Sequence, residues 1–484
     1  LFTSYFLINL IILFLIKAYL ADKQNDIKTV KQWLYFAVVL AIGFSNHMTT
    51  LLILPGTAYL YFNSRGFNKS SFKTILIMLA VFFPVLLLIY LYLPWRASSD
   101  AVINWGNPDN FERFFRHVSG KQYQVWLFSS TDAAKRQLIY FFNSLPKEFG
   151  INLFIAAIGL FAAYIYSKRF FVFAFITFLS TVLYSINYDI VDIDSYFLLA
   201  FISLSMMAVF GVIKLFELLR FKRFDFFLPG VLIFLFIVIQ AYSNFGDINQ
   251  SDTYTFEDYS KALVASTDKN SIIFGYQWDY FISPAYYFQF VENYRKDVAI
   301  VDKELLRRSW YYNQTNNNYP RVFDDLKPEV ETFLNALKPF ERDENFNPQL
   351  LEKTYRNIMT GLVSTNIDES TIYIASELFE KEMQNGEFAL PQGYQLIPDL
   401  FLFKVVKTGS NYISAKDPDF IIRFPKNGNH YTNFIKNLVG SMLARRAMYE
   451  LQFNKTERAK LYVNKIVKEF PGYQLPAGLT EVLK

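Results

Sequence analysis

The first half of the chain is a series of apolar runs that polar loops separate. A helix needs about 20 apolar residues to cross about 30 Å of hydrocarbon, and most of the runs approach that length. The pattern predicts eight candidate spans, at residues 1–20, 33–45, 48–62, 74–93, 151–166, 170–187, 196–219 and 226–242. The spans at 33–45 and 48–62 are short, which indicates either a tight hairpin that turns at residues 45–47 or tilted helices in a thin part of the bilayer.

Lys and Arg residues in four connecting loops predict how these spans are oriented. Cytoplasmic loops of membrane proteins carry an excess of Lys and Arg. The loops hold Lys23, Lys28 and Lys31; Arg65, Lys69 and Lys73; Lys168 and Arg169; and Arg220, Lys222 and Arg223. An even alternation of spans places all four loops in the cytoplasm. The extracytoplasmic face then receives residues 45–47, 94–150, 188–195 and everything after 243.

The second half of the chain has the pattern of a small α/β domain. Short β-branched runs predict strands, and amphipathic segments between them predict helices and some parallel pairing. The strands are expected at 271–274, 298–301, 371–375 and 400–405, and the helices include 281–294 and 303–312. Residues 433–452 and 456–470, followed by Pro471 and Gly472, predict a helical hairpin. It is either one tetratricopeptide-like unit or a plain helical cap on the α/β domain.

Three regions follow from these patterns. Residues 1–242 form a transmembrane region of about eight helical spans with an extracytoplasmic loop at 94–150. Residues 243–426 form an extracytoplasmic α/β domain, and residues 427–484 form the helical hairpin. The fold class is therefore a polytopic α-helical membrane protein followed by a soluble α/β domain and a C-terminal helical hairpin.

Composition agrees with this division and excludes several kinds of chemistry. Of 484 residues 52% are hydrophobic and 53 are Phe. The net charge of +5 averages two unlike halves, so it indicates no nucleic-acid partner. The chain has no Cys, and it lacks the phosphate-loop, dinucleotide, HExxH and GxSxG motifs. No cofactor or metal is expected. Because Leu1 already lies inside an apolar run, we expect a fragment whose beginning is missing.

The densest group of chemistry-capable side chains follows the fourth span. Pro94 is expected to end that helix, which places Arg96 at the level of the lipid headgroups. Arg binds phosphate through two parallel hydrogen bonds, although an interfacial Arg also serves as a membrane anchor. Trp105 and Asn107 lie in a turn whose aromatic tip could stack on a sugar ring. Trp is also common at membrane interfaces without any ligand.

Histidines and aspartates on the same face are further candidates. His47 and His117 could hydrogen-bond a substrate or pass a proton. Asp189, Asp192 and Asp194 lie where one span leaves the membrane and the span at 196–219 begins. A carboxylate there could act as a base, bind a cation or orient a hydroxyl. Helix capping by Asp194 or by Ser195 is the competing explanation.

Four ordered blocks of sequence resemble a known family. Residues 92–123, YLPWRASSDAVINWGNPDNFERFFRHVSGKQY, resemble the signature of a large bacterial membrane-protein family related to protein O-mannosyltransferases, in the GT-C glycosyltransferase superfamily. The other blocks are FSNHMTTLLILP at 44–55, NYDIVDIDSYFL at 187–198, and residues 271–314. His47 falls on the family's His. The chain departs from the family pattern at Leu199 and Lys296, where the family usually has Pro.

The resemblance implies an enzyme of the bacterial cytoplasmic membrane. It would transfer a sugar, such as mannose, from a polyprenyl-phosphate carrier to a hydroxyl of an acceptor protein on the extracytoplasmic face. Family members carry their catalytic carboxylate upstream of the position equivalent to Leu1, which leaves Asp192 and Asp194 as the candidates within this chain. The substrate-binding candidates are His47, Arg96, Trp105, Asn107, His117 and Tyr123. The alternative is a non-catalytic, membrane-anchored binding or assembly module.

Overall fold

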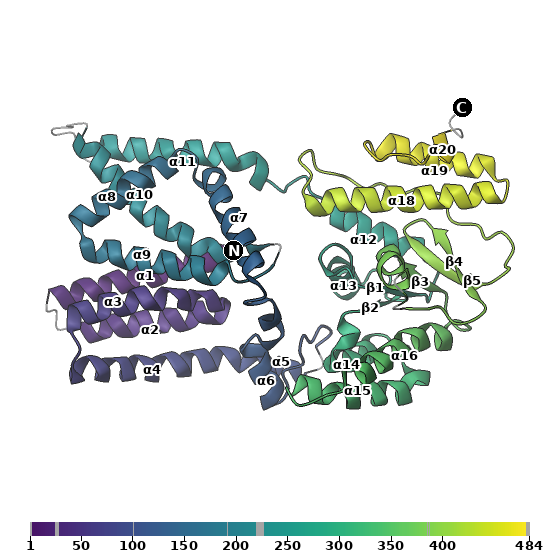
Figure 1. The fold of residues 1–484 in the computed structure, drawn as a ribbon, viewed down its shortest axis with the longest axis horizontal. Coiled ribbons are helices and arrows are strands. Elements are labelled where there is room, and N and C mark those ends of the chain that lie inside the picture. The colour runs from purple at the N-terminus through teal and green to yellow at the C-terminus, as the bar shows by residue number, and fades with distance from the viewer. Residues whose placement is uncertain are drawn as a thin grey trace. The chain divides into compact units, whose positions relative to one another are not determined.

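The computed structural model describes residues 2–24, 29–99, 101–190, 192–218, 227–384, 386 and 388–480. The chain divides into two compact units (Figure 1). The helical unit consists of Leu1–Asp100 and Asn107–Gly246, and the mixed unit consists of Ala101–Gly106 and Asp247–Lys484.

Every predicted span is mainly helical where the structure describes it. The helices of the helical unit are α1 (Phe2–Lys23), α2 (Thr29–Asn46), η1 (Met48–Ile53), α3 (Leu54–Arg65), α4 (Lys69–Tyr90), α5 (Tyr92–Ala97), α6 (Phe111–Val118), η2 (Lys121–Trp126), α7 (Thr131–Phe149), α8 (Asn152–Tyr166), α9 (Lys168–Ser185), η3 (Ile193–Phe197), α10 (Leu198–Leu218) and α11 (Phe227–Ile248). The short segment 48–62 is divided between η1 and α3.

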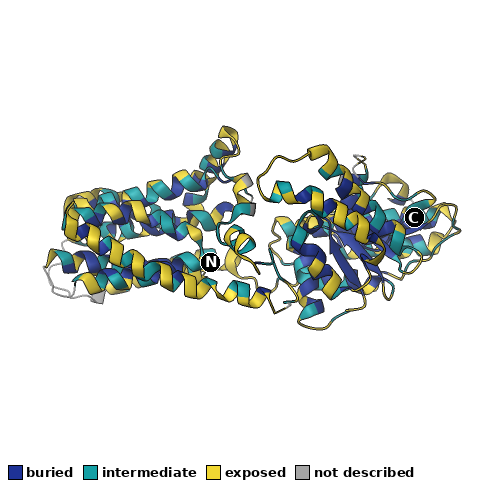
Figure 2. Cartoon of the chain, turned by 90° about the horizontal axis from the view of Figure 1, so that it is seen from below, coloured by how far each residue is buried: buried dark blue, intermediate teal, exposed yellow. Residues whose placement is uncertain are grey.

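Four of the described helical segments are long and apolar enough to cross a membrane: Phe2–Lys23, Lys69–Ala97, Lys168–Ser185 and Ile193–Leu218. The pair α7 and α8, bent by 104°, adds a fifth if it forms one span. The chain is thus a multi-pass membrane protein, and the count of eight crossings stays a prediction. Large apolar side chains cover the outside of α4, where Leu76 is 67% and Leu88 72% exposed (Figure 2). Such a surface is stable in lipid and unfavourable in water.

Small residues allow the membrane helices to approach one another closely. A Cβ on Gly159 of α8 would lie 1.9 Å from the carbonyl oxygen of Met207, and one on Gly211 of α10 would lie 2.0 Å from that of Ile155. The two backbones therefore touch where the glycines face each other. In lipid, no hydrophobic force drives two helices together, because lipid tails are as apolar as the side chains. Membrane helices therefore associate through close van der Waals contact, which small residues permit.

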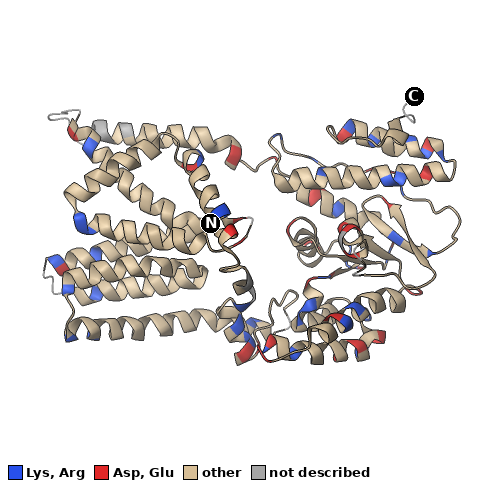
Figure 3. Cartoon of the chain, in the orientation of Figure 1, with Lys and Arg blue, Asp and Glu red and all other residues tan. Residues whose placement is uncertain are grey.

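The basic loops that the structure describes lie at one end of the helical unit, at the left of Figure 3. Asp22 ties two of them together, because it accepts from Trp33 Nε1 at 2.8 Å and from Ser64 at 3.0 Å and pairs with Arg65 at 3.7 Å. The first three loops thus share one end of the helical unit, as the prediction requires, and the assignment of that end to the cytoplasm stays a prediction. Lys28 and the fourth loop, with Arg220, Lys222 and Arg223, lie outside the described residues.

The segment 94–150, which we expected to be a connecting loop, is largely helical. Pro94 does not end the fourth span, because it is the third residue of α5, where its missing N–H has no helical partner to lose. Ser130 caps α7 by accepting from Ala133 N at 3.1 Å, and the helix ends at Gly150 with φ 50°. Phe141, Leu145 and Phe149 repeat every four residues on its buried side.

The mixed unit contains a five-stranded sheet in the order β2-β1-β3-β5-β4. The strands are β1 (Ile272–Gly275), β2 (Ala299–Asp302), β3 (Ile372–Ala375), β4 (Tyr394–Asp399) and β5 (Leu402–Lys407). β2, β1 and β3 are parallel, and β5 is antiparallel to both β3 and β4. The four predicted strands are confirmed. We missed β4 because its residues are mostly half-buried and carry no run of β-branched side chains.

Helices cover both faces of the sheet. Alternate residues of a strand point to opposite faces, so Ile273 packs in one core and Ile272 and Phe274 pack in the other. The helices and helical turns are α12 (Thr255–Ser266), η4 (Trp278–Ile282), α13 (Ser283–Phe290), η5 (Leu305–Arg307), α14 (Ser309–Asn318), η6 (Asp324–Leu326), α15 (Lys327–Glu341), α16 (Pro348–Asn366), α17 (Ser376–Leu378), η7 (Phe379–Met383), α18 (His430–Gln452), α19 (Thr456–Glu469) and α20 (Ala477–Thr480).

The predicted hairpin is a helical cap on the sheet. Ile435, Val439 and Leu443 of α18 share a core with Ile273 and Tyr373 of the strands. The expected parts 243–426 and 427–484 therefore belong to one compact unit.

A buried ion pair lies inside this cap. Arg446 and Glu450 are 1% and 0% exposed and lie 2.7 Å apart. Removing one partner of such a pair leaves an uncompensated buried charge, so the cap depends on both residues.

Candidate functional site

Polar side chains gather at the end of the helical unit that lies opposite the basic loops. His47 follows the end of α2, and the segment 187–192 follows α9, and both helices begin at the basic end. The polar end is built from the turn between α2 and η1, from α6, η2 and α7, and from residues 187–197.

Three side chains from one turn of α7 hold the acidic segment 187–194. Arg136 Nη2 lies 3.2 Å and 3.3 Å from the two carboxylate oxygens of Asp189. Gln137 Nε2 donates to the carbonyl oxygen of Ile190 at 2.8 Å. Tyr140 Oη donates to Asp194, with distances of 2.8 Å and 3.0 Å to its carboxylate oxygens. Because residues i, i+1 and i+4 lie on one side of a helix, a single face of α7 sets the position of both aspartates.

An aromatic cluster under this turn keeps α7 in place. The ring of Phe141 lies 4.7 Å from that of Phe197 and stacks on Phe201 at 5.8 Å. Phe141 and Phe197 are both fully buried. The packing of these buried rings therefore fixes the position of the α7 side chains that make the polar contacts.

A short β-bridge joins η2 to the acidic segment. Leu127 and Tyr188 pair in antiparallel fashion. Asp189 N donates to the carbonyl oxygen of Trp126 at 3.0 Å, and Phe128 N donates to that of Asn187 at 2.7 Å. This bridge brings Tyr123, which is exposed in η2, to the polar end.

Asp192 and Asp194 differ in their surroundings. Asp192 is exposed and makes no hydrogen bond or ion pair with any described residue. Asp194 is also exposed, but Tyr140 binds its carboxylate. The capping explanation is wrong for both Asp194 and Ser195, because the N-cap of η3 is Asp192, which makes no side-chain cap bond, and α10 begins only at Leu198.

His47 is half-buried against the same segment. It is the N-cap of η1, its Nδ1 lies 2.7 Å from Thr49 Oγ1, and its ring meets Tyr196 edge-on at 5.4 Å. Burial lowers the pKa of the His47 imidazole below its usual value. The ring is therefore neutral at pH 7, and a neutral imidazole can donate from one nitrogen and accept at the other.

Asn107, His117 and the glycine after α6 also belong to this end. Asn107 has φ 38° and donates from Nδ2 to Asp109 at 3.1 Å. His117 is half-buried in the last turn of α6, and burial lowers the pKa of its imidazole. A Cβ on Gly120 would lie 3.6 Å from Met48 Sδ, so the chain after α6 reaches the residue that follows His47.

Arg96 lies in the last turn of α5 with its guanidinium exposed. Its one side-chain contact among the described residues is a long hydrogen bond of 3.4 Å from Nη1 to Ser99 Oγ. Most of its donors are therefore available to a ligand.

Trp105 belongs to the mixed unit, whereas the other candidates belong to the helical unit. Its ring is 5.0 Å from that of Trp278 and 5.3 Å from that of Trp310. Asn104 N donates to Gln314 Oε1 at 2.8 Å, which holds the segment in that unit. Neither of our two explanations for Trp105 included this aromatic contact, and its role in sugar binding stays a prediction.

The sequence did not point to several residues of the polar end, namely Arg136, Gln137, Tyr140, Tyr188 and Tyr196. A usable signal was present, because the buried residues Ala133, Gln137, Phe141, Leu145 and Phe149 repeat at four-residue intervals. That repeat would have revealed α7, and hence the face that binds the aspartates.

An open pocket of about 410 Å³ lies between α7 and the acidic segment, lined by Arg136, Gln137, Tyr140, Asp189 and Ile190. Across the described residues no group of three or more His, Asp or Glu side chains could hold a metal ion.

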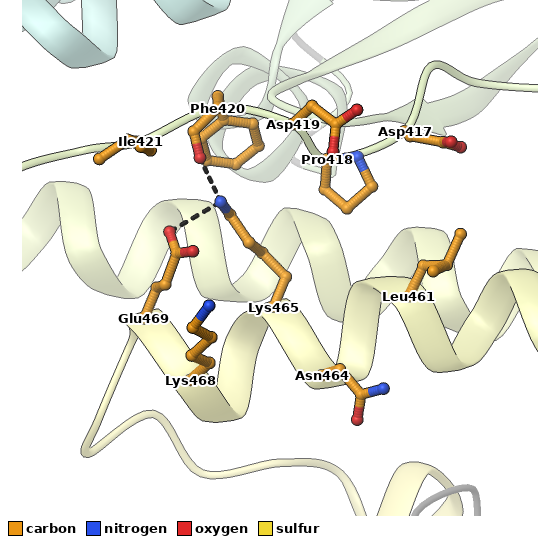
Figure 4. Close-up of a pocket in the computed structure, with 10 residues that line it drawn as sticks. All are labelled: Asp417, Pro418, Asp419, Phe420, Ile421, Leu461, Asn464, Lys465, Lys468 and Glu469. Atoms are coloured by element: carbon orange, nitrogen blue, oxygen red, sulfur yellow. Dashed lines mark hydrogen bonds and ion pairs between the residues drawn. The ribbon is translucent and has the colours of Figure 1, made fainter.

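The mixed unit has a pocket of its own, of about 460 Å³, between α19 and the extended segment 417–421 (Figure 4). Lys465 points into it and contacts both the carbonyl oxygen of Phe420 and the carboxylate of Glu469. Side chains of the hairpin also bind the residues just before this extended segment. Arg458 donates to the carbonyl oxygen of Ala415 at 2.7 Å, and Tyr462 donates to that of Lys416 at 2.9 Å. This pocket is thus closed on one side by the protein's own main chain.

Comparison with known families identifies two parts of the chain. Residues 2–71 match the protein O-mannosyl-transferase TMEM260 N-terminal domain, and residues 256–321 match TMEM260-associated domain 2. These two stretches are thus similar to two domains of the TMEM260 protein O-mannosyltransferase family. The TMEM260 N-terminal domain runs from α1 into the start of α4 and contains His47. The match to TMEM260-associated domain 2 covers β1, β2 and all of α14. No solved structure matches the chain.

Proposed function

We propose that this chain is a membrane protein O-mannosyltransferase. It transfers mannose from a polyprenyl-phosphate carrier to a hydroxyl of an acceptor protein on the extracytoplasmic face of a bacterial cytoplasmic membrane. The match of residues 2–71 to the TMEM260 N-terminal domain carries this proposal. The polar end of the apolar helical unit, where His47 and the two aspartates gather, supports it.

The reaction exchanges one bond to the anomeric carbon for another. The acceptor hydroxyl oxygen attacks that carbon, the bond from the carbon to the phosphate oxygen breaks, and polyprenyl phosphate leaves. The hydroxyl proton must pass to a base. We assign this role to Asp192, because its carboxylate is exposed and makes no hydrogen bond with the described residues. Asp194, which Tyr140 already binds, orients the reactants instead.

Arg96 would bind the phosphate of the carrier. It lies at the end of the apolar helix Lys69–Ala97, where we expect the lipid headgroups and a lipid-linked phosphate. Negative charge develops on that phosphate as the bond to the sugar breaks. A guanidinium with free donors stabilises this charge through bidentate hydrogen bonds.

The neutral His47, together with Asn107, His117 and Tyr123, would contact the acceptor and the sugar. Hydrogen-bonding groups of this kind position reactants without adding net charge. They agree with a hydroxyl acceptor and a neutral sugar as the two groups that meet at the site.

Transfer by the purified full chain in liposomes tests the proposal. The donors are polyprenyl-phosphate mannose and, for comparison, a nucleotide-linked mannose, and the acceptors are folded extracytoplasmic domains and Ser/Thr peptides. We expect transfer from the polyprenyl donor alone, to acceptors on one side of the bilayer. Absence of transfer from either donor, together with stable capture of a protein by the mixed unit, would support the assembly module instead.

A further inference from the structure

The pocket between α7 and the acidic segment has no part in the reaction as described so far. We propose that this pocket, lined by Arg136, Gln137, Tyr140, Asp189 and Ile190, binds the hexose ring of the donor rather than its phosphate or its lipid. This inference rests on the proposed function, because it assigns a place to the sugar that the proposed reaction transfers.

The size and the lining of the pocket suit a small polyhydroxylated ligand. Its volume of about 410 Å³ falls among small-molecule sites, which range from about 300 to 1,000 Å³. Arg136 supplies hydrogen-bond donors, Asp189 supplies acceptors, and Tyr140 can do both. Vicinal hydroxyls of a sugar need this mixture, because each one donates one hydrogen bond and accepts others.

Hydrogen-bonding capacity remains unused in the pocket. Arg136 is 63% exposed and uses only Nη2 in its contact with Asp189, so its other N–H groups have no partner among the described residues. The second partner of Asp189 is distant, with Ser129 Oγ at 3.5 Å. A ligand can therefore engage both residues without breaking a tight network.

The charges favour a neutral sugar over a phosphate. Asp189 lines the pocket, and Asp194 lies one hydrogen bond away through Tyr140. A phosphate in the pocket would face both carboxylates with one guanidinium to offset them, and like charges at such distances repel. A hexose carries no charge and avoids this cost.

The pocket also lies at the right place for the reaction. Tyr140 both lines it and donates to Asp194, so a ring held there is one side chain away from the acidic segment. The three α7 residues lie on a single helical turn, which gives the pocket a rigid wall.

The competing explanation is that the Arg136–Asp189 pair only clamps the acidic segment to α7 and binds no ligand. A variant with the two charges exchanged distinguishes this explanation from sugar binding. If the Arg136–Asp189 pair only holds the segment to α7, the double variant R136D/D189R should restore what either single variant loses. If the pair binds hydroxyls in a defined geometry, the swap keeps the clamp but does not restore sugar binding.

Binding of three carriers tests the assignment. We would measure the affinity of the full chain for polyprenyl phosphate that carries mannose, glucose or no sugar. Arg136→Gln and Asp189→Asn should each weaken binding of the mannosyl carrier by about tenfold and reduce the preference for mannose over glucose. Neither variant should change binding of the bare carrier. Equal weakening of the mannosyl and bare carriers, or rescue by the charge swap, would overturn the assignment.

Two controls keep the result interpretable. Lys214→Gln removes a matched exposed pair with Glu217, at 3.1 Å, near the other end of α10, and it should leave all three affinities unchanged. If Arg136→Gln unfolds, Arg136→Lys retains the charge and loses the planar fork, and the same loss of mannose preference is expected. The sugar-site assignment and the proposed function can fail separately. If the wild-type protein transfers mannose but both pocket variants bind the mannosyl carrier normally, only the sugar-site assignment is wrong. If the wild-type protein binds the mannosyl carrier but transfers mannose to no acceptor, only the proposed function is wrong.

Discussion

Tyr140 of α7 donates its hydroxyl hydrogen to Asp194, with both carboxylate oxygens of that residue within 3.0 Å. The two residues lie 54 positions apart in the chain, so this bond exists only because α7 packs beside η3. It fixes the acidic segment relative to the helix that forms the wall of the adjacent pocket.

Removing this hydroxyl tests whether the bond positions the reactants. Hydrogen bonds to charged groups contribute about 1.5–3 kcal/mol, and each ~1.4 kcal/mol is a tenfold change in rate. We expect Tyr140→Phe to lower the transfer rate by about tenfold or more, with the fold retained because the ring stays in place. The measurements are the rate of mannosyl transfer and the thermal unfolding midpoint. Tyr166→Phe removes a hydroxyl that binds Glu217 at the basic end and is the matched control. An unchanged rate in Tyr140→Phe would show that the bond has no part in transfer.

The two aspartates should differ in their effect on catalysis. General-base catalysis contributes about 10²–10⁴ in rate, so Asp192→Asn is expected to lose an amount in this range. Asp194→Asn should lose only about tenfold, because asparagine still accepts a hydrogen bond from Tyr140. Single-turnover transfer rates measure both. The reverse order of the two losses would move the base to Asp194, and small losses in both variants would place the base outside these residues.

Replacing Arg96 separates phosphate binding from membrane anchoring. Loss of a bidentate contact to phosphate should weaken donor binding by about tenfold or more in Arg96→Ala. Arg96→Lys keeps a long cationic side chain that reaches the headgroups, so it preserves an anchor but not the planar fork. We expect Arg96→Lys to raise the KM for the donor as well. Full recovery of the KM in this variant would indicate an anchor with no ligand.

Asp302 should make the mixed unit sensitive to pH. Burial raises the pKa of its carboxyl to about 7, from a usual value of 3.8. The folded state therefore holds the proton more tightly than the unfolded state, and the free energy of unfolding falls as pH rises between these two values. Hydrogen exchange in the peptide that covers β2 and η5 should accelerate from pH 5 to pH 8, after correction for the intrinsic rate.

Asparagine at this position should remove that dependence. Asp302→Asn cannot ionise, and its Oδ1 can still accept from the backbone N–H groups of Glu304 and Leu305, which now lie at 2.7 Å and 3.0 Å. Asp297 provides the contrast, because its hydrogen bond to Arg295 lowers the pKa of its carboxyl. The contribution of Asp297 to the free energy of unfolding is complete above the ordinary carboxyl pKa of 3.8, and it is lost only as pH falls below that pKa. Asp297→Asn should therefore leave the pH dependence of hydrogen exchange between pH 5 and pH 8 as it is in the wild-type protein. If Asp302→Asn also kept the wild-type dependence, our assignment to Asp302 would be contradicted.

Local sequence patterns account for the main secondary-structure elements of this protein. Apolar runs predicted every described span, because lipid requires each crossing segment to satisfy its own backbone as a helix. The Lys and Arg residues of the loops predicted that these loops share one end, because such residues collect on one side of a membrane. The β-branched runs predicted β1, β2, β3 and β5. β4 was not predicted, since its half-buried residues carry no such run.

Tertiary packing alone decided the contacts that make up the site. The bond from Tyr140 to Asp194 and the pair Arg136–Asp189 join α7 to a segment that lies about fifty residues later in the chain, and no periodicity encodes which helices become neighbours. Trp105 shows the same limit, because a turn that follows a membrane helix in the sequence contributes its ring to the aromatic cluster of the mixed unit. By itself, the amino-acid sequence determined the apolar helices, four of the five strands and the end of the helical unit where the candidate residues lie, but not β4 or α7. The packing of helix against helix decided which of those residues meet, because side-chain contacts depend on distances that a linear pattern does not contain.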